Sequence, residues 1–385
     1  MKNVLKKFLA VLVAALILLV SAPCAFAASD VDSLLYDIWD GEVNVSGCKS
    51  AFNGTLTIPS TIEGYPVTRI ESDAFYNQSG ISAINLPAGL TSIGENAFYG
   101  TGYYNKSSNW KNGVLYIDSY LVATQVNSSD KKTLSGACTV QSGTKLIAES
   151  AFEDCTGLTS VSLPSGLLYI GEYAFNRCSG LTQVVLPDSV KEIGYSAFTN
   201  CSNLTSVKLG NSLASIDEYA FFGCTSLKSV AVPDNVKTIG ICAFGYAFNS
   251  NYAFVKISGF KLICNKGSAA YNYAVKNGFS WTTPKVKSVS VSDASINYKG
   301  DTVLDVNVDA DAGANYTVSF TSSDTGVVTV DSDGKVYGAK EGKATVTCTV
   351  TDAAGNSVSD TCTVKVTYAW WQVLIRIVLL GFLWY

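Results

Sequence analysis

Apolar and polar residues follow a pattern that returns every 23 residues along most of this chain. In the repeat 158–180, the apolar side chains of Val161 and Leu163 alternate with serines. Alternation with a period of two predicts a strand that buries one face. Pro164 then ends the strand, because proline has no N–H group to donate to a neighbouring strand.

The clearest marker of the repeat is the dipeptide Ala-Phe. It occurs at Ala74-Phe75, Ala97-Phe98, Ala151-Phe152, Ala174-Phe175, Ala197-Phe198, Ala220-Phe221 and Ala243-Phe244. A fixed period of this length predicts stacked repeats, in which each repeat covers the apolar face of the next. A single repeat cannot fold alone. Burying a large apolar side chain gains about 1.5–3 kcal/mol, whereas ordering each residue costs about 1.5 kcal/mol.

The segments that flank the repeats predict a beginning and an end of the stack. Residues 29–80 contain strand-like runs that suit an atypical first repeat. Residues 265–281 predict a helix that caps the last repeat, with Ser268 as its N-cap and Gly278 just beyond its end. The apolar side of that helix is formed by Ala270, Tyr273 and Ala274.

One insertion interrupts the period. The Ala-Phe dipeptides on either side of it are 54 residues apart, which is 23 plus 31 additional residues, 103–133. Within it, two apolar runs flank Asp118-Ser119 and predict a β-hairpin. Insertions in repeat proteins often bind ligands, so Trp110, Tyr116 and Tyr120 are candidate ligand-binding residues. The alternative is that these rings only pack the hairpin against the solenoid.

A second candidate surface lies along the repeats themselves. The strand positions that face away from the core are small and polar, and tyrosines lie beside the Ala-Phe dipeptides. Solenoids use extended surfaces of this kind to bind proteins. The candidates are Tyr173, Gln183, Lys208 and Tyr219. The alternative is an ordinary solvated face without a ligand.

Beyond residue 284 the Ala-Phe repeat disappears and alternating strands begin. Residues 284–367 predict about seven strands and therefore a small β-sandwich. Counting outward from Gly355 puts Cys348 opposite Cys362, so either a cross-strand disulfide or two opposed free thiols is expected. Asp331 and its neighbours lack most ligands of an EF-hand calcium loop, and a plain β-turn is expected there.

Both ends of the chain are apolar. Residues 1–27 combine basic residues, an apolar run and an A-x-A site, which predicts a secretory signal peptide. Residues 369–385 predict a hydrophobic helix that holds the protein at the membrane by spanning it or lying on its surface, because aromatic residues bracket the run. The expected anchor residues are Trp370, Trp371, Arg376, Trp384 and Tyr385.

Charge and composition narrow the function. The formal charge is −4, and it becomes −4 − 3 = −7 without the three lysines of residues 1–27, so nucleic acid is not an expected partner. The chain has no histidine, which excludes Ser-His-Asp and Cys-His catalysis. No motif indicates catalytic, metal or cofactor-binding residues. Four cysteines share one repeat position and are expected to be buried thiols: Cys155, Cys178, Cys201 and Cys224.

Two resemblances extend this interpretation. The phrase L-x-x-V-x-L-P-x-x-[VL]-x-x-I-G-x-x-A-F-x-x-C, found across residues 42–281, resembles the BspA-type leucine-rich repeat family of bacterial surface proteins. The string TSSDTGVVTVDSDGKVYGAKEGKATVTCTV resembles the bacterial immunoglobulin-like domain of intimins and other surface proteins, although Phe320 stands where tryptophan is more usual. These resemblances imply a curved solenoid, a spacer or adhesion module, and binding of host or neighbouring-cell proteins.

The sequence therefore predicts a mainly β protein. A leucine-rich repeat solenoid (28–283) is followed by an immunoglobulin-like β-sandwich (284–367) and a C-terminal hydrophobic helix. The expected function is that of an exported cell-surface protein, not an enzyme, which binds a protein partner such as a host matrix protein. The alternatives are a passive structural component of the envelope and a polysaccharide-binding module.

Overall fold

The computed structural model describes residues 29–125, 132–352 and 355–375. They divide into two compact units, which are described separately. The first contains the residues up to Leu181 together with Ile193–Cys201, and the second contains Thr182–Glu192 and the residues from Ser202 onward. The architecture is that of the predicted solenoid followed by an immunoglobulin-like domain.

The first unit opens with a β-hairpin on which parallel strands then stack. β1 and β2 pair antiparallel, β5 pairs parallel with β2, and β7 pairs parallel with β5. A second ladder joins β3 and β6. These elements are α2 (Ser29–Ser33), β1 (Leu34–Trp39), β2 (Glu42–Cys48), β3 (Gly54–Thr57), β4 (Thr61–Ile62), β5 (Tyr65–Ile70), β6 (Ile81–Asn85) and β7 (Ser92–Ile93). The expectation of an atypical opening built from strands is confirmed.

The insertion forms a hairpin and then returns to the stack. β9 and β10 pair antiparallel around Asp118-Ser119, as predicted. β10 then pairs parallel with β12, and β12 with β14. The elements are α3 (Gly102–Asn105), η1 (Ser107–Asn109), β8 (Trp110–Lys111), β9 (Val114–Ile117), β10 (Tyr120–Thr124), β11 (Ser135–Thr139), β12 (Leu146–Ile147), β13 (Gly157–Ser162), β14 (Tyr169–Ile170) and β16 (Glu192–Ile193).

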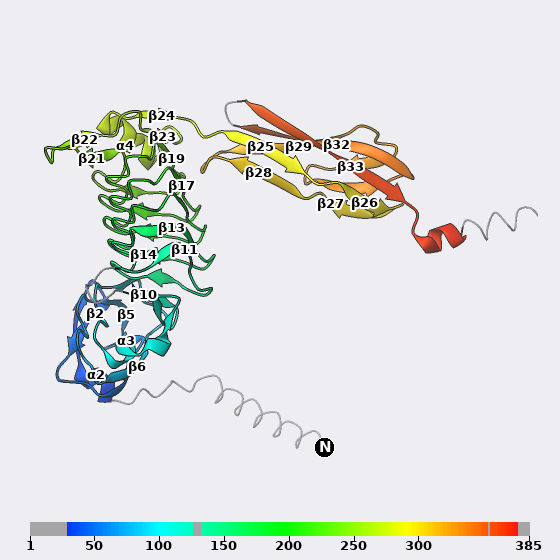
Figure 1. Cartoon of the computed structure of the whole chain (residues 1–385). Coiled ribbons are helices and arrows are strands. Elements are labelled where there is room, and N and C mark those ends of the chain that lie inside the picture. The colour runs from blue at the N-terminus through cyan, green and yellow to red at the C-terminus, as the bar shows by residue number, and fades with distance from the viewer. Residues whose placement is uncertain (1–28, 126–131, 353–354, 376–385) are drawn as a thin grey trace, which may run out of the picture. The chain divides into compact units, whose positions relative to one another are not determined.

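The second unit continues the same repeat. β15, β17, β19, β23 and β24 follow one another in a parallel sheet (Figure 1). The elements are β15 (Gln183–Val185), β17 (Ser206–Lys208), β18 (Ser215–Ile216), β19 (Ser229–Ala231), β20 (Thr238–Ile239), β21 (Tyr246–Phe248), β22 (Phe254–Lys256), β23 (Lys261–Ile263), α4 (Ala269–Asn277) and β24 (Ser280–Thr282). The cap is confirmed, because Ser268 accepts from the N–H of Tyr271 and Gly278 is left-handed at φ 62°.

The Ala-Phe dipeptides explain why the repeats stack. Their phenylalanine rings are fully buried and lie nearly parallel, with centroids 4.8 Å apart for Phe152 and Phe175 and 5.0 Å apart for Phe175 and Phe198. The backbone adds a ladder, since the Phe152 N–H donates to the Ala174 carbonyl at 2.7 Å. Each turn therefore covers the ring of its neighbour and satisfies its amide.

The predicted column of cysteines is also buried in this stack. Cys155, Cys178, Cys201 and Cys224 have no exposed surface and are free thiols. The Cys178 Sγ lies 3.1 Å from the Phe152 carbonyl, and the Cys201 Sγ lies 3.1 Å from the Phe175 carbonyl. The thiols thus fill the turns as small hydrophobic groups with a weak donor.

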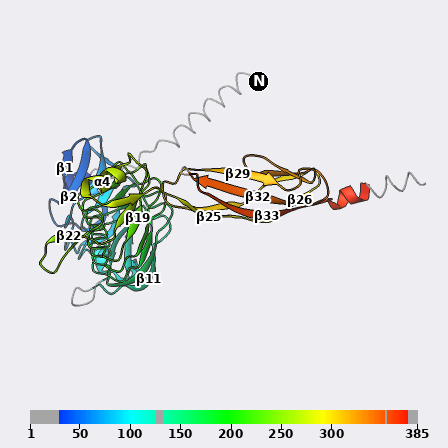
Figure 2. The ribbon, with the colours of Figure 1, turned by 90° about the horizontal axis from the view of Figure 1, so that it is seen from above.

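Among its described residues, the C-terminal domain is a β-sandwich with nine strands rather than about seven, and two of these strands are only three residues long. One sheet has the order β26-β33-β32-β29, a second the order β27-β31-β30, and β25 pairs with β28. Figure 2 shows the long antiparallel pair β32–β33. The strands are β25 (Val286–Val291), β26 (Ala294–Asn297), β27 (Asp301–Val303), β28 (Val306–Ala310), β29 (Tyr316–Ser322), β30 (Val328–Val330), β31 (Lys335–Gly338), β32 (Gly342–Asp352) and β33 (Ser357–Thr367).

The expected pairing of the two sandwich cysteines is wrong. Asp360 lies opposite Cys348, and Val346 lies opposite Cys362, so the thiols are diagonal neighbours. The hairpin is centred one residue earlier than the Gly355 from which the positions were counted. Both cysteines are buried and free. At the predicted β-turn, the Asp331 carboxylate accepts hydrogen bonds from backbone N–H groups of the turn itself.

The terminal predictions fall largely outside the described residues. The signal peptide, 1–27, lies there entirely, as do Arg376, Trp384 and Tyr385. Residues 370–375 are helical and include Trp370 and Trp371, which are exposed. Among the described residues, the structure contains no helix long and apolar enough to span a membrane.

Candidate functional site

A pocket of about 350 Å³ opens in the first unit between two neighbouring Ala-Phe turns. One turn contributes Glu95 through Tyr99, and the other contributes Glu149 through Asp154. These turns are separated in sequence by the insertion, which itself contributes Val122, Ala123 and Lys132. We call this cavity the register-break pocket.

The insertion creates the pocket by replacing a bond of the ladder. In the regular stack, the phenylalanine N–H of one turn donates to the alanine carbonyl of the next, as Phe75 does to Ala97 and Phe152 does to Ala174. At the interruption, the Ala151 carbonyl instead accepts from the backbone N–H of Thr124 at 3.1 Å and from its Oγ1 at 2.7 Å. Because β10 occupies this place, the Phe98 turn and the Phe152 turn are separated and a gap remains.

One wall of the pocket is aromatic. The rings of Tyr76 and Tyr99 stack with centroids 5.4 Å apart and an interplanar angle of 13°. Tyr104 lies 4.9 Å from Tyr99. Trp110 supports this wall from behind, since its ring meets Tyr104 edge-on at 5.0 Å and its Nε1 donates to the Tyr104 carbonyl at 2.7 Å. The tyrosine rings that line the pocket are therefore fixed in place.

Acidic side chains also line the pocket. Burial raises the pKa of both Glu95 and Glu149, and the negative charge of Glu153 raises both further. The Glu149 carboxylate accepts from the Glu95 N–H at 3.1 Å and from Ser72 at 3.2 Å. Burial is the larger cause of both shifts, because it disfavours the charged form of a carboxyl group.

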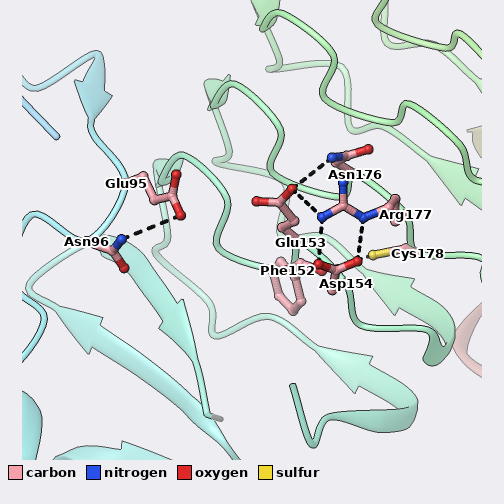
Figure 3. Close-up of polar contacts among 8 residues, drawn as sticks. All are labelled: Glu95, Asn96, Phe152, Glu153, Asp154, Asn176, Arg177 and Cys178. Atoms are coloured by element: carbon pink, nitrogen blue, oxygen red, sulfur yellow. Dashed lines mark hydrogen bonds and ion pairs between the residues drawn. The ribbon is translucent and has the colours of Figure 1, made fainter. Parts of the chain in front are cut away.

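Two further carboxylates are held by an arginine from the next repeat. Arg177 contacts the Asp154 carboxylate through Nε at 2.5 Å and through Nη2 at 2.6 Å, and it contacts Glu153 through Nη2 at 3.0 Å. Figure 3 shows this contact and, on the other turn, Glu95 beside Asn96. The Arg177 guanidinium holds the pKa of Asp154 below its usual value. Glu153 and Asp154 are thereby fixed at the edge of the pocket.

Lys132 is the single cation among the described residues that line the pocket. Its Nζ donates to the main-chain carbonyls of Thr124 and Ala151, at 3.4 Å and 3.5 Å. Burial lowers the pKa of Lys132, and the nearby negative groups, Glu153 and Glu95 among them, oppose that effect. Within the described parts of the chain, Lys132 forms no ion pair with a carboxylate.

A second hollow of the first unit, of about 640 Å³, shares Glu149 with the pocket. Six of its fifteen lining residues are acidic, Glu42, Glu71 and Glu172 among them, and Arg69 is the one described cation. This part of the solenoid is therefore acidic on two adjoining surfaces. Among the described residues, no group of three or more side chains is arranged to hold a metal ion.

The three candidate ligand-binding residues of the insertion have different surroundings in the structure. Trp110 supports the aromatic wall, as described. Tyr120 has no exposed surface, and its hydroxyl donates to the Pro87 carbonyl inside the core. Tyr116 is 9% exposed, and its hydroxyl accepts from the Gln141 N–H at 3.1 Å. The expectation that Tyr116 and Tyr120 face a ligand is therefore corrected: both faces of this hairpin are covered, and the two rings pack the core.

The other candidates lie apart from the pocket. Gln183 and Lys208 are exposed on β15 and β17. Tyr173 lies edge-on to Tyr195, and Tyr219 contacts Phe222 and Phe254. Both Tyr173 (φ 53°) and Tyr219 (φ 60°) have left-handed backbone, a conformation that is uncommon for a tyrosine.

Sequence reasoning missed the residues that form most of the pocket. Tyr76 and Tyr99 directly follow Ala-Phe dipeptides, and Glu95 and Glu149 precede them by two positions. The signal that could have found them is the unequal spacing itself, since the turns on either side of an insertion lose their normal contacts. The sequence predicts ligand-binding residues in the insertion and along the strands. In the structure, the main effect of the insertion is to separate the turns beside it.

Family models match two parts of the chain. The BspA type leucine rich repeat region matches residues 48–133 and 131–251 in six copies. The bacterial Ig-like domain (group 2) matches residues 285–364. Both families are typically non-catalytic. None of the curated proteins matches this chain.

Several solved structures resemble this chain. The leucine rich repeat protein of T. pallidum is 22% identical over 65% of this chain and 96% of its own, with a TM-score of 0.29. A leucine rich cell surface protein of Faecalibacterium prausnitzii is 24% identical over 62% of each chain, with a TM-score of 0.27. A SusE-like surface located polysaccharide binding protein of Bacteroides thetaiotaomicron is 16% identical over 32% of this chain and 22% of its own, with a TM-score of 0.20. At these scores the similarities carry no argument about a ligand.

Proposed function

This chain belongs to the family of proteins with BspA-type leucine-rich repeats, and on that basis we propose that it is a bacterial cell-surface protein that binds a partner protein at the register-break pocket. The pocket is the single observation that carries the proposal. Its volume suits one large side chain or a short turn of a partner, and rigid aromatic rings beside charged groups are typical of the central residues of protein interfaces.

The second unit carries exposed strand positions of its own, which this proposal does not need. Gln183 and Lys208 are exposed on parallel strands, and Val185 between them in sequence is 55% exposed. A side chain bound in the pocket would provide the specific contact. Fold alone does not fix a ligand, and for this reason the proposal rests on the pocket rather than on the family.

A polysaccharide is the second candidate ligand. Tyr76 is 45% exposed and stacks on Tyr99, so one flat aromatic face is accessible to a sugar ring. The carboxylates of Glu95 and Glu149 could accept hydrogen bonds from sugar hydroxyl groups. We favour a protein partner because the pocket carries several carboxylates, and a cationic side chain compensates buried carboxylates better than the neutral hydroxyl groups of a sugar do.

The remaining parts of the chain fit a protein that is held at the cell surface. In this proposal, residues 1–27 direct export, the immunoglobulin-like domain acts as a spacer, and residues 369–385 associate with the membrane. The protein carries out no catalysis, takes no cofactor and binds no nucleic acid. Its partner is an extracellular protein, such as a host matrix protein.

The proposal is tested by comparing the parent protein with a Tyr99→Ala variant. Both are immobilised, and purified extracellular matrix proteins and cell-wall polysaccharides are passed over them in a binding assay. We expect saturable binding of at least one protein to the parent and much weaker binding to the variant. A Tyr252→Ala variant is the matched control, because Tyr252 is 84% exposed on the loop between β21 and β22. Binding that is equal in all three proteins would contradict the proposal.

A further inference from the structure

We propose that the register-break pocket recognises a positively charged side chain, a lysine or an arginine, of the partner. This inference rests on the proposed function and adds the chemical class of the group that the pocket binds. It follows from three properties of the pocket: its charge, its aromatic wall and the place of Lys132.

The charge of the pocket favours a cation. Four carboxylates line it, those of Glu95, Glu149, Glu153 and Asp154, and Lys132 is the one described lining cation. Arg177 lies outside the lining and contacts two of the carboxylates. Counting it as well, the charge is −4 + 1 + 1 = −2. An incoming ammonium or guanidinium group would meet carboxylates that are already partly removed from water, where charge-assisted hydrogen bonds are strongest.

Two of the four carboxylates have only neutral donors among their described hydrogen-bond partners. Arg177 holds Glu153 and Asp154, whereas Glu95 has Asn96 as its one described side-chain partner, at 3.5 Å. Glu149 accepts from a hydroxyl and a backbone amide, both of them neutral donors. Glu95 and Glu149 are therefore the carboxylates to which an incoming cation would bind.

The aromatic wall supplies the second contact that a cation needs. Tyr76, Tyr99 and Tyr104 line the pocket, and their rings are fixed by stacking and by Trp110. A cation within about 6 Å of a ring centroid is attracted to the face of the ring. A pocket lined by both aromatic rings and carboxylates thus suits lysine and arginine side chains, which combine a charged end with an apolar stem.

Lys132 places one ammonium group in the lining of the pocket. This single positive charge does not neutralise the four carboxylates. The Lys132 Nζ donates to two main-chain carbonyls, that of Thr124 in the insertion and that of Ala151 on the Phe152 turn, and within the described residues it has no carboxylate within ion-pair distance. The negative groups around it, Glu153, Glu95 and Asp154 among them, favour its charged form. The same field acts on any further cation that enters from solvent.

The test uses the full chain and fluorescent hexapeptides, with binding followed by anisotropy. The probes are hexalysine, hexaarginine, hexaglutamine and hexaglutamate, and maltohexaose is tested as an unlabelled competitor and by calorimetry. We expect the two basic peptides to bind and the neutral and acidic ones not to bind. Their affinity should fall steeply when sodium chloride is raised from about 0.05 M to about 0.5 M, because salt screens the attraction.

Substitutions distinguish the pocket from the general acidity of the chain. Glu95→Gln combined with Glu149→Gln should weaken hexaarginine binding by at least about tenfold, since charged hydrogen bonds are lost. Tyr99→Leu should weaken it about fivefold. The matched control is Glu218→Gln, because Glu218 precedes its Ala-Phe dipeptide by the same two positions in another repeat. It removes a negative charge but should leave binding unchanged.

The outcomes separate this inference from the proposed function. If basic peptides bind the Glu95→Gln/Glu149→Gln variant as well as they bind the parent, the inference is wrong. If maltohexaose or a neutral peptide binds, and its binding is lost on Tyr99→Leu but kept in the Gln variant, the pocket binds a neutral ligand: the inference fails and only the ligand-binding role remains. If no pocket variant affects any probe or partner protein, both proposals fail. Circular dichroism of each variant confirms that it is folded.

Discussion

The Thr124 N–H donates to the Ala151 carbonyl at 3.1 Å, in the place that a phenylalanine of the preceding repeat occupies elsewhere in the stack. This bond is one of several that join the insertion to the solenoid, and it takes the place of a bond between the turns that carry Phe98 and Phe152. The register-break pocket is the direct consequence. An insertion in a solenoid can thus form a site without presenting its own side chains, by separating the repeats beside it.

The first prediction concerns the second hydrogen bond that Thr124 donates to the Ala151 carbonyl, the one from its hydroxyl group. Thr124→Val should lower the free energy of unfolding by about 1 kcal/mol, because the Thr124 hydroxyl is buried and donates to Ala151 at 2.7 Å. Urea unfolding measures the change. The matched control is Thr205→Val, which removes an exposed hydroxyl bonded to the Thr182 carbonyl at 3.0 Å and should change stability by less than about 0.5 kcal/mol. An equal loss in both variants would argue against a special role of Thr124.

The second prediction concerns the phenylalanine column. Phe198→Ala should destabilise the protein by about 3–5 kcal/mol, because the ring is fully buried and stacks 5.0 Å from that of Phe175. The shift of the urea midpoint gives the loss. Val185→Ala, at a position that is 55% exposed, is the control. A loss for Phe198→Ala no larger than for the control would contradict the stacked core.

The third prediction concerns the thiols. Cys178 and Cys201 should be unlinked in peptides analysed by mass spectrometry without reduction, because each thiol points to a carbonyl of the preceding turn. Cys348 and Cys362 should also be unlinked. They are diagonal across β32 and β33, where Cβ atoms lie roughly 7–8 Å apart, and a disulfide needs about 3.8 Å. A peptide that joins either pair would overturn the corresponding assignment.

The fourth prediction concerns pH. Burial raises the pKa of Glu149 above 4.5, and the charges of Glu172 and Glu153 add to the shift. The ionised carboxylate therefore destabilises the folded state above the folded pKa, and the cost disappears as pH falls below 4.5. Glu149→Gln should melt at a higher temperature than the parent at about pH 7 and at the same temperature near pH 4. A lower melting temperature at pH 7 would show that the contacts with Ser72 and the Glu95 N–H outweigh this cost.

The fifth prediction concerns the C-terminal segment. Deleting residues 369–385 should move the protein from the cell fraction into the medium, since aromatic residues bracket an apolar run there. Immunoblotting of both fractions measures the change. Arg376→Leu in the full chain is the companion variant, and loss of retention in it would point to a polar partner of Arg376. A truncated protein that stays with the cells would contradict the anchor.

Several features were predictable because they depend on neighbours in sequence or on the repeat. The period of 23 places every Ala-Phe dipeptide at the same position of a turn, so burial of one implies burial of all. The cap around Ser268 and Gly278 follows from local backbone chemistry. Other features depended on register. The apolar run that begins at Tyr120 predicted a strand but could not tell that both of its faces are covered.

By itself, the sequence determined the repeat, the column of phenylalanines, the column of thiols and the change to a sandwich, because each is repeated or local. Only the tertiary structure decided where the pocket lies. Glu95 and Glu149 are 54 residues apart, and nothing between them in sequence shows that they meet. They meet in the fold because their turns both line the register-break pocket, where the Glu149 carboxylate accepts from the Glu95 N–H at 3.1 Å.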